Sequence, residues 1–139
     1  MKYREYLDEW VLRENTSINL DIPDISISCY PELLGIVFFN LIGNGLKYNE
    51  SKSPLVKCTM DDDGSKITFT IKDNGIGINP DYKERIFQPF ERLHSSKIQG
   101  SGLGLSICKR IIELHKGEIW LDSNTKIGSE FKFSIPKNI

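Results

Sequence analysis

The stretch G-S-G-L-G-L at Gly100–Leu105 decides the fold, because three other motifs precede it in a fixed order. Upstream lie N-L-I-G-N-G-L-K-Y at Asn40–Tyr48, D-N-G-I-G at Asp73–Gly77 and I-F-Q-P-F at Ile86–Phe90. A glycine cluster on its own is a weak signal, since glycine marks turns as readily as phosphate loops. Four motifs within one short chain say far more about the fold than any one of them.

The composition is that of one ordinary globular domain. A chain of 139 residues can bury a core within a single domain, which we predict to span residues 1–139. Its formal net charge is −1, with acidic and basic residues interspersed, so a nucleic-acid partner is not expected. The sequence has neither a long apolar run nor a signal peptide. We therefore expect a cytoplasmic domain without direct membrane contact, and leave open a membrane-anchored parent protein.

The three cysteines, Cys29, Cys58 and Cys108, are odd in number and lack the spacing of metal ligands. Cys29 and Cys58 fall in alternating strand patterns, and Cys108 falls on a predicted helix. We expect thiols in or near the core of a protein in a reducing compartment.

The first part of the chain predicts a helix, a strand and a longer helix. Within residues 1–16, one helical face carries aromatic and aliphatic residues, which are Tyr3, Tyr6, Leu7, Trp10 and Val11. This helix either packs on the core, which we favour, or is the connection to a preceding dimerisation domain. Alternation at Ile25–Cys29 predicts a strand. Pro31 suits the first turn of a helix that runs to about Tyr48.

The rest of the chain predicts a hairpin, two helices and two strands. Apolar alternation at Val56–Met60 and Ile67–Ile71, around a D-D-G-S turn, predicts an antiparallel hairpin. A short helix is expected at Tyr82–Phe87, and a long one follows from Leu103, with Ile107, Ile111 and Leu114, to Gly117. Strands follow at residues 119–121 and 131–135. The predicted fold class is α+β: a two-layer sandwich with a mixed, mostly antiparallel sheet and helices on one face.

Asn40 and Asn44 are four residues apart on a predicted helix, so both amides project from one face. An amide oxygen is a neutral, hard ligand that suits a Mg²⁺ shell completed by water and phosphate. Lys47, on the same side, offers a positive charge to phosphate, and Tyr48 offers a flat face for stacking. The alternative for the motif alone is a helix with two solvated or capping asparagines.

Asp73 closes a predicted strand and enters a glycine-rich loop. Its carboxylate can accept a hydrogen bond from the exocyclic amine of adenine, while Gly75 and Gly77 allow a close approach of the backbone. An ordinary turn accounts for D-N-G taken alone. Phe87 and Phe90 are expected to anchor the following loop to the core.

Gly100, Gly102 and Gly104 precede or open the second long helix, whose positive end attracts phosphate. No G-K-[S/T] follows them and no strand leads directly into them, so their order differs from that of the P-loop and of the dinucleotide fold. Gly128-Ser129 before the last strand is a weak signal, which a hairpin turn also explains.

Together, these motifs resemble the ATP-binding catalytic domain of sensor histidine kinases, a branch of the GHKL nucleotide-binding family, from about Ile18 to Pro136. The resemblance implies that Asn44 binds Mg²⁺, that Asn40 and Lys47 lie at the phosphates, and that Tyr48 packs on adenine. Arg92, with Lys97 as the alternative, would reach the terminal phosphates from a lid at Glu91–Gln99. The resemblance also implies that the rest of the ATP site is formed by Asp73, Gly75, Gly77, Ile78, Phe87, Phe90, Gly100, Ser101, Gly102, Leu103, Gly104 and Leu105.

Two features depart from the family pattern. Val37 stands where sensor kinases often carry a basic residue, so one phosphate or catalytic contact is in doubt. Neither His94 nor His115 lies in the context of a phosphoacceptor histidine. The resemblance therefore implies transfer to a histidine on a separate dimerisation domain, with ADP as product and a response regulator downstream.

Asn40 separates the kinase branch from the ATPase branches, which place a glutamate there as general base. Because an amide cannot take a proton from water, the sequence favours phosphoryl transfer over hydrolysis. We predict a protein-histidine kinase catalytic domain. The alternatives are a non-catalytic nucleotide-dependent binding module, supported by Val37 and the missing acceptor domain, and a serine-kinase or anti-sigma relative.

Overall fold

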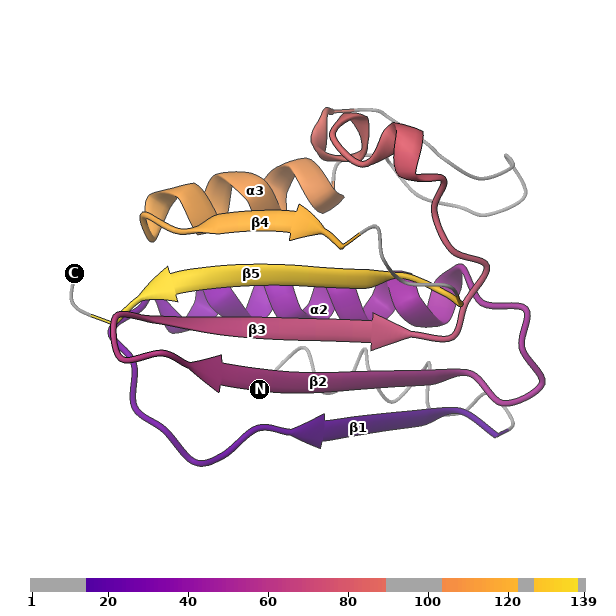
Figure 1. Cartoon of the computed structure of the whole chain (residues 1–139), viewed down its shortest axis with the longest axis horizontal. Helices are drawn as coiled ribbons and strands as arrows, with labels where there is room; N and C mark the ends of the chain where they lie inside the picture. The colour runs from indigo at the N-terminus through magenta and orange to yellow at the C-terminus, as the bar shows by residue number, and fades with distance from the viewer. Residues whose placement is uncertain (1–14, 90–103, 123–126, 138–139) are drawn as a thin grey trace.

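The structure is a computed structural model of the chain and describes residues 15–89, 104–122 and 127–137. Figure 1 shows one sheet with the strand order β1-β2-β3-β5-β4. The elements, labelled as in that figure, are β1 (Ser17–Asp21), α2 (Pro31–Lys47), β2 (Leu55–Asp62), β3 (Lys66–Asp73), η1 (Pro80–Tyr82), η2 (Arg85–Phe87), α3 (Gly104–Leu114), β4 (Glu118–Leu121) and β5 (Glu130–Pro136).

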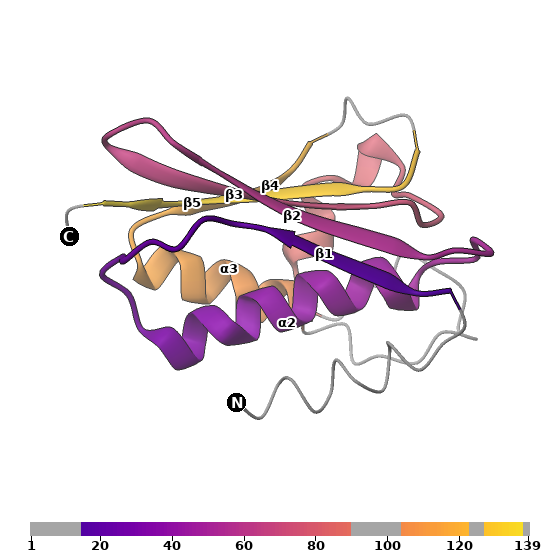
Figure 2. The same cartoon turned by 90° about the horizontal axis from the view of Figure 1, so that it is seen from below.

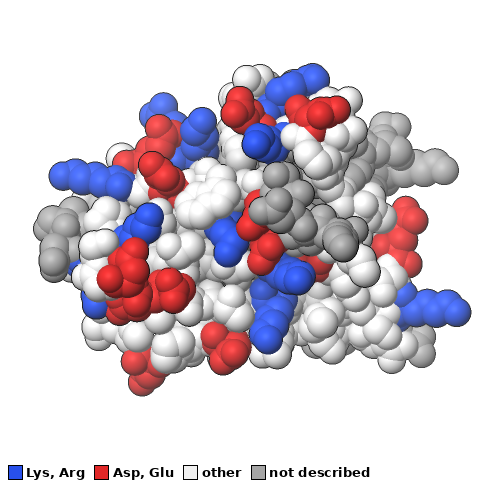
Figure 3. Space-filling view, viewed as in Figure 1, with Lys and Arg blue, Asp and Glu red and all other residues white. Residues whose placement is uncertain are grey.

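Both described α-helices cover one face of the sheet, as Figure 2 shows. β1 pairs with β2 in parallel, whereas the β2–β3, β3–β5 and β4–β5 pairs are antiparallel. The predicted two-layer α+β sandwich with a mixed, mostly antiparallel sheet is therefore confirmed. On the opposite face of the sheet, lysine and arginine lie among aspartate and glutamate (Figure 3), without a continuous basic stripe.

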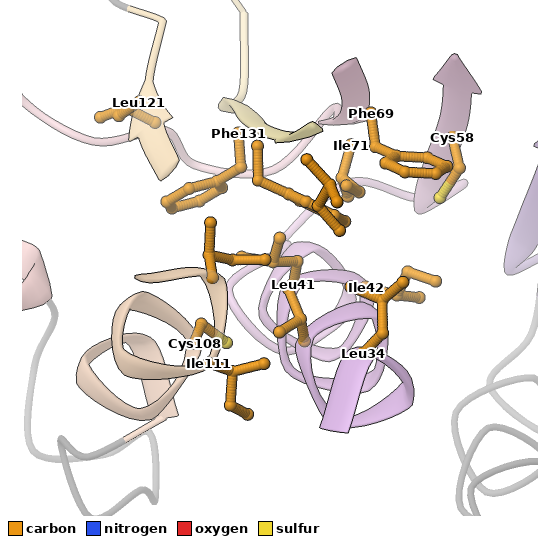
Figure 4. Close-up of a cluster of buried hydrophobic side chains, with 14 of the residues drawn as sticks. Leu34, Leu41, Ile42, Cys58, Phe69, Ile71, Cys108, Ile111, Leu121 and Phe131 are labelled. Atoms are coloured by element: carbon orange, nitrogen blue, oxygen red, sulfur yellow. The ribbon is translucent and has the colours of Figure 1, made fainter. Parts of the chain in front are cut away.

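The core lies between the sheet and the two helices (Figure 4). Alternation along the strands sends every second residue of β2, β3 and β5 toward the helices. Phe38 of α2 packs edge-on against Phe69 and Phe133, at centroid distances of 5.2 and 5.3 Å. The other buried members of this core include Leu34, Val37, Leu41, Ile42, Val56, Cys58, Ile67, Ile71, Phe131 and Ile135.

Val37 is fully buried in this core. A basic side chain at this position would place a charge among apolar residues, which is unfavourable without a partner. In this chain the position therefore contributes to packing and not to a phosphate contact.

The strand predicted at Ile25–Cys29 is wrong, and a strand that we did not predict, β1, lies at Ser17–Asp21. β1 is an edge strand whose side chains are mostly exposed, so the alternation that reveals a half-buried strand is weak there. Ile27 and Cys29 pack against the core from the irregular segment that leads to α2. The alternation of these two residues therefore reflects their packing against the core and not pairing in a sheet.

The short helix predicted at Tyr82–Phe87 is instead two 3₁₀ turns, η1 and η2. Pro80 opens η1, and the side chain of Asn79 accepts a hydrogen bond from the Asp81 N–H at 3.0 Å. The helix predicted within residues 1–16 lies largely outside the described residues.

α3 ends where expected, although Lys116 and not Gly117 adopts the left-handed conformation, with φ 61°. The Gly117 N–H donates to the Ile112 carbonyl at 2.9 Å, as in a Schellman motif. Gly117 is required for a different reason, because a Cβ there would overlap the Ser134 carbonyl oxygen of β5. Ile107 and Leu114 are exposed, and the buried face of α3 is formed by Cys108, Ile111 and Ile112.

Cys58 and Cys108 are buried, and desolvation raises the pKa of each thiol to about 12. Cys29 is half-buried and its pKa is also raised by burial. The prediction of core or near-core thiols is confirmed. Among the described residues, no cluster of histidine, cysteine or acidic side chains could hold a metal ion, and no helix is long and apolar enough to cross a membrane.

Candidate functional site

The site is built where the second half of α2 meets the end of β3. A Cβ at Gly45 would lie 2.8 Å from Cγ2 of Val56 and 2.9 Å from Cβ of Asp73. Only glycine allows the helix to approach the sheet this closely. The glycine within the N-L-I-G-N-G-L-K-Y motif thus brings the predicted phosphate-side helix against the predicted adenine-side carboxylate.

The Asp73 carboxylate is held in one orientation by three hydrogen bonds. Oδ1 accepts from the Gly75 N–H at 2.8 Å and from the Ser129 N–H at 3.2 Å, while Oδ2 accepts from the Ser129 hydroxyl at 2.5 Å. Burial raises the pKa of Asp73, against the opposing effect of these bonds. A carboxylate has about four acceptor sites, and these three bonds occupy three of them.

Ser129 is a site residue that the sequence reasoning left as a weak motif or a simple turn. Gly128 makes the contact possible: it has φ 69°, and a Cβ on it would overlap the Asp73 carbonyl oxygen. The available signal was the position of Gly128-Ser129 directly before a strand, but no local pattern showed that this strand lies beside β3.

The glycine-rich loop after Asp73 is fixed to two neighbours. The Ile76 N–H donates to the Tyr48 carbonyl at 3.0 Å, and a Cβ on Gly75 would overlap that same oxygen. Gly77 has φ 80°, and a Cβ there would lie 3.0 Å from the Gly128 carbonyl oxygen. The close approaches seen here are between protein backbones, whereas the expected approach to an adenine ring stays a prediction.

The predicted phosphate-side residues come together at the same end of the helix layer. The Asn40 Nδ2 donates to the Ile36 carbonyl at 2.8 Å, and its Oδ1 would lie 2.7 Å from a Cβ on Gly104. The first residue of α3 therefore sits against Asn40, and the positive end of α3 faces this region. α2 and α3 run antiparallel (Figure 2).

Asn44, Lys47 and Tyr48 occupy the last turn of α2 and its cap. Asn44 is half-buried, and its amide makes no side-chain hydrogen bond to another described residue. Lys47 is exposed, with its Nζ 5.7 Å from the centroid of the half-buried Tyr48 ring. The last turn of α2 and its cap thus carry an amide, a cation and an aromatic ring next to Gly45, which packs against Asp73.

Phe87 is buried and packs edge-on against Phe131, with centroids 6.2 Å apart, so its ring is part of the core. Ile78 and Leu105 are half-buried against the same core. The remaining predicted site residues lie outside the described residues: Phe90, Arg92, Lys97, Gly100, Ser101, Gly102 and Leu103, together with the lid.

His115 lies at the opposite end of the helix pair and is buried. Its Nε2 accepts from the Tyr30 N–H at 3.0 Å, and its Nδ1 lies 2.8 Å from the Ile111 carbonyl oxygen. Both ring nitrogens are therefore engaged within the protein, in agreement with the prediction that His115 is not a phosphoacceptor.

Residues 29–139 match the model of the family described as histidine kinase-, DNA gyrase B- and HSP90-like ATPase. The chain belongs to this family. It is similar to the phytochrome-like protein Cph1 of Synechocystis sp., with 52% identity over 101 residues, which cover 72% of this chain and 14% of Cph1. The chain therefore spans a small part of that relative.

Solved structures show which branch of the family the fold follows. The catalytic domain of histidine kinase ThkA superposes with a TM-score of 0.81 at 27% identity, over 98% of this chain and 90% of that one. Full-length ShkA, solved in complex with AMPPNP, gives a TM-score of 0.79 at 27% identity, over 97% of this chain and 28% of ShkA. The chain is thus a histidine-kinase-type ATP-binding catalytic domain, as the resemblance implied.

Proposed function

We propose that this domain binds ATP with Mg²⁺ and transfers the γ-phosphoryl group to a histidine on a separate dimerisation domain. The observation that carries the proposal is the buried Asp73 carboxylate, oriented by Ser129 and Gly75 beside the end of α2. The domain boundaries, residues 1–139 with residues 1–16 as an N-terminal helix or connection to the dimerisation domain, are part of the same proposal.

Asp73 recognises the base in this proposal. Its remaining acceptor site takes the exocyclic amine of adenine, and a base with a carbonyl there would face a negative charge. A hydrogen bond to a charged group contributes about 1.5–3 kcal/mol, enough for a clear preference over guanine. Tyr48 packs beside the ring.

The donor set suits Mg²⁺, which keeps several water and phosphate ligands and needs few from the protein. Asn44 would hold the ion by its amide oxygen, and the ion would neutralise phosphate charge. Lys47 and the positive end of α3 bind phosphate oxygens, while Arg92 or Lys97 would reach the terminal phosphate.

Asn40 makes the domain a transferase and not a hydrolase. It lies against Gly104 with its Nδ2 bonded to Ile36, and an amide cannot accept a proton from water. An acceptor imidazole is already nucleophilic, so transfer requires positioning and charge neutralisation in place of a base. The N–P bond forms as the bond from the γ-phosphorus to the ADP oxygen breaks.

ThkA is also solved in complex with the response regulator protein TrrA, which supports a response regulator as the downstream partner here. The non-catalytic binding module is the alternative. Val37 is buried in the core and offers no phosphate contact, as that alternative assumes, and the transfer assay decides between the two.

A transfer assay tests the proposal. The dimerisation domain of the parent protein is incubated with this domain and γ-labelled ATP, and acid-labile label on the acceptor histidine is expected. Asp73→Asn is the matched variant that should lose transfer, and the domain alone should stay unlabelled on His94 and His115. Stable label on either histidine would contradict the two-domain mechanism.

A further inference from the structure

Asn49 is a buried polar residue just beyond α2 to which none of the site motifs assigns a role. Its Nδ2 donates to the Gly45 carbonyl at 3.0 Å and to Oδ1 of Asn74 at 2.8 Å. Its Oδ1 accepts from the Ser51 N–H at 2.9 Å. Both protons of the amide nitrogen and the amide oxygen therefore have partners inside the protein.

Asn74 is the other half of this contact and directly follows Asp73. Its Oδ1 also accepts from the Leu55 N–H at 2.8 Å, and its Nδ2 donates to the Ser53 carbonyl at 3.0 Å. We call Asn49 and Asn74 the amide pair. It joins the end of α2, the segment leading into β2, and the loop after β3.

The amide pair spans the two halves of the proposed site. Asn49 is two residues beyond Lys47 on the phosphate side, and Asn74 is one residue beyond Asp73 on the base side. Both lie past the regular elements, since α2 ends at Lys47 and β3 at Asp73. The regular hydrogen bonds of the helix and the strand therefore end at Lys47 and Asp73, where the phosphate side and the base side of the proposed site meet.

We propose that the amide pair positions the Asp73 loop against the end of α2, so that one nucleotide engages its base and phosphate groups at the same time. Asn49 and Asn74 are positioning residues and do not touch the nucleotide. The inference rests on the proposed function, since it assumes that ATP binds across these two elements.

A ligand that binds through two groups gains affinity when both receiving groups are held at the right separation. Loss of the amide pair should therefore weaken ATP, which uses both halves, and spare adenosine, which uses only the base side. A general loss of stability would instead lower the binding of both ligands by the same factor, because it reduces only the folded fraction.

The experiment compares wild type with Asn49→Ala, using Mg-ATP in calorimetry and adenosine in a chemical-shift titration. We expect ATP affinity to fall about tenfold, the equivalent of one or two buried hydrogen bonds, and adenosine affinity to stay within about twofold. Equal weakening of both ligands, or no weakening of ATP, would overturn the inference.

Three further variants complete the design. Asn74→Ala should likewise weaken ATP and spare adenosine, and it replaces Asn49→Ala as the test if that variant does not fold. Asn74→Asp keeps the oxygen that accepts from Asn49 and Leu55, so it should retain ATP affinity better than Asn74→Ala; equal loss in both would count against the amide pair. Asp63→Ala removes three hydrogen bonds in the distant hairpin turn and should change neither affinity.

The wild-type titration separates this inference from the proposed function. If wild type binds ATP and the variants do not weaken ATP more than adenosine, only the amide pair fails. If wild type shows no saturable ATP binding, the proposed function fails and the inference falls with it.

Discussion

The two ends of the antiparallel pair α2 and α3 are built differently. At the far end, the His115 ring bonds to the Tyr30 N–H and the Ile111 carbonyl, and Gly117 lies directly against Ser134 of β5. At the site end, Gly45 lies against the side chains of Val56 and Asp73, and Gly104 lies against the side chain of Asn40. There, however, Asp73 keeps an acceptor site and Lys47 stays exposed.

This difference separates stability from function along one helix pair. The far end satisfies its polar groups internally, so changes there should lower the free energy of unfolding and leave nucleotide affinity intact. The site end is the end proposed to bind the nucleotide, so changes there should act on affinity more than on folding. The predictions below test this separation, beginning with the largest expected effect.

Two glycine substitutions compare the ends directly. Gly117→Ala and Gly128→Ala each place a Cβ onto a backbone carbonyl oxygen, and each should cost about 3 kcal/mol or more of unfolding free energy in chemical denaturation. Gly128→Ala should also abolish ATP binding by displacing Asp73, whereas folded Gly117→Ala should bind normally. Gly64→Ala, with φ 91° and open space, is the control and should cost about 1–2 kcal/mol.

His115→Ala should lower the unfolding free energy by about 2–4 kcal/mol, because it leaves a cavity and an unpaired Tyr30 N–H. The affinity of the folded protein for Mg-ATP should not change, which calorimetry below the melting transition would measure. A tenfold loss of ATP affinity would show that the two ends are coupled.

Asp73→Asn reverses this pattern. Loss of the charged acceptor should weaken ATP by about 10- to 150-fold, the equivalent of 1.5–3 kcal/mol. The change in unfolding free energy should be smaller, because the neutral amide avoids the desolvation that raises the pKa of Asp73. Denaturation and titration of the same sample would measure both. If Asp73→Asn lowers the unfolding free energy strongly while its folded fraction binds ATP as tightly as wild type, the assignment of the carboxylate to the base is contradicted.

The pH dependence of Asp73 should act in opposite directions on folding and binding. Since burial raises the pKa in the folded state, the stability linked to this group is fully present below the pKa of the unfolded state and is lost as pH rises through the folded-state pKa. ATP binding needs the charged form, so affinity should fall as pH drops through that raised pKa. The Asp73→Asn profile should be flat over this window; a matching slope would assign the effect to another group.

Asn44→Ala should have the smallest effect on binding of the base. If Asn44 holds Mg²⁺, the variant should bind ADP in EDTA as tightly as wild type does. It should lose most of the increase in nucleotide affinity that Mg²⁺ gives to wild type. Transfer should fall much further, because the ion neutralises charge as the bond breaks. Titrations of both proteins with and without Mg²⁺ would show whether the ion depends on this amide, and an unchanged Mg²⁺ gain would exclude Asn44 as its ligand.

The sequence predicted the parts of this molecule that rest on local pattern. Apolar periodicity correctly predicted the helix α2, and the D-D-G-S turn between two alternating runs correctly predicted the hairpin of β2 and β3. The sequence did not predict β1, because an exposed edge strand shows little alternation. A strand was wrongly predicted at Ile25–Cys29, because Ile27 and Cys29 are partly buried in an irregular segment and produce the same alternating pattern.

The sequence proposed Asp73 from its residue type and its place at the end of a strand, but it did not reveal the neighbours from distant elements that bond to it. The bond from Ser129 to Asp73 joins residues 56 positions apart, and the Asn49–Asn74 contact joins residues 25 apart. Such contacts depend on strand order and on glycines that permit close approach. Residue type alone therefore revealed the carboxylate but not the residues that hold it.

A calorimetric comparison of Mg-ATP and Mg-GTP on the wild-type domain tests the central claim most directly. The oriented Asp73 carboxylate should favour adenine by at least about tenfold, because a charged acceptor contributes about 1.5–3 kcal/mol. Saturable ATP binding with this preference is the predicted result. Equal affinities for ATP and GTP would mean that Asp73 does not read the base, and would contradict the account of this site.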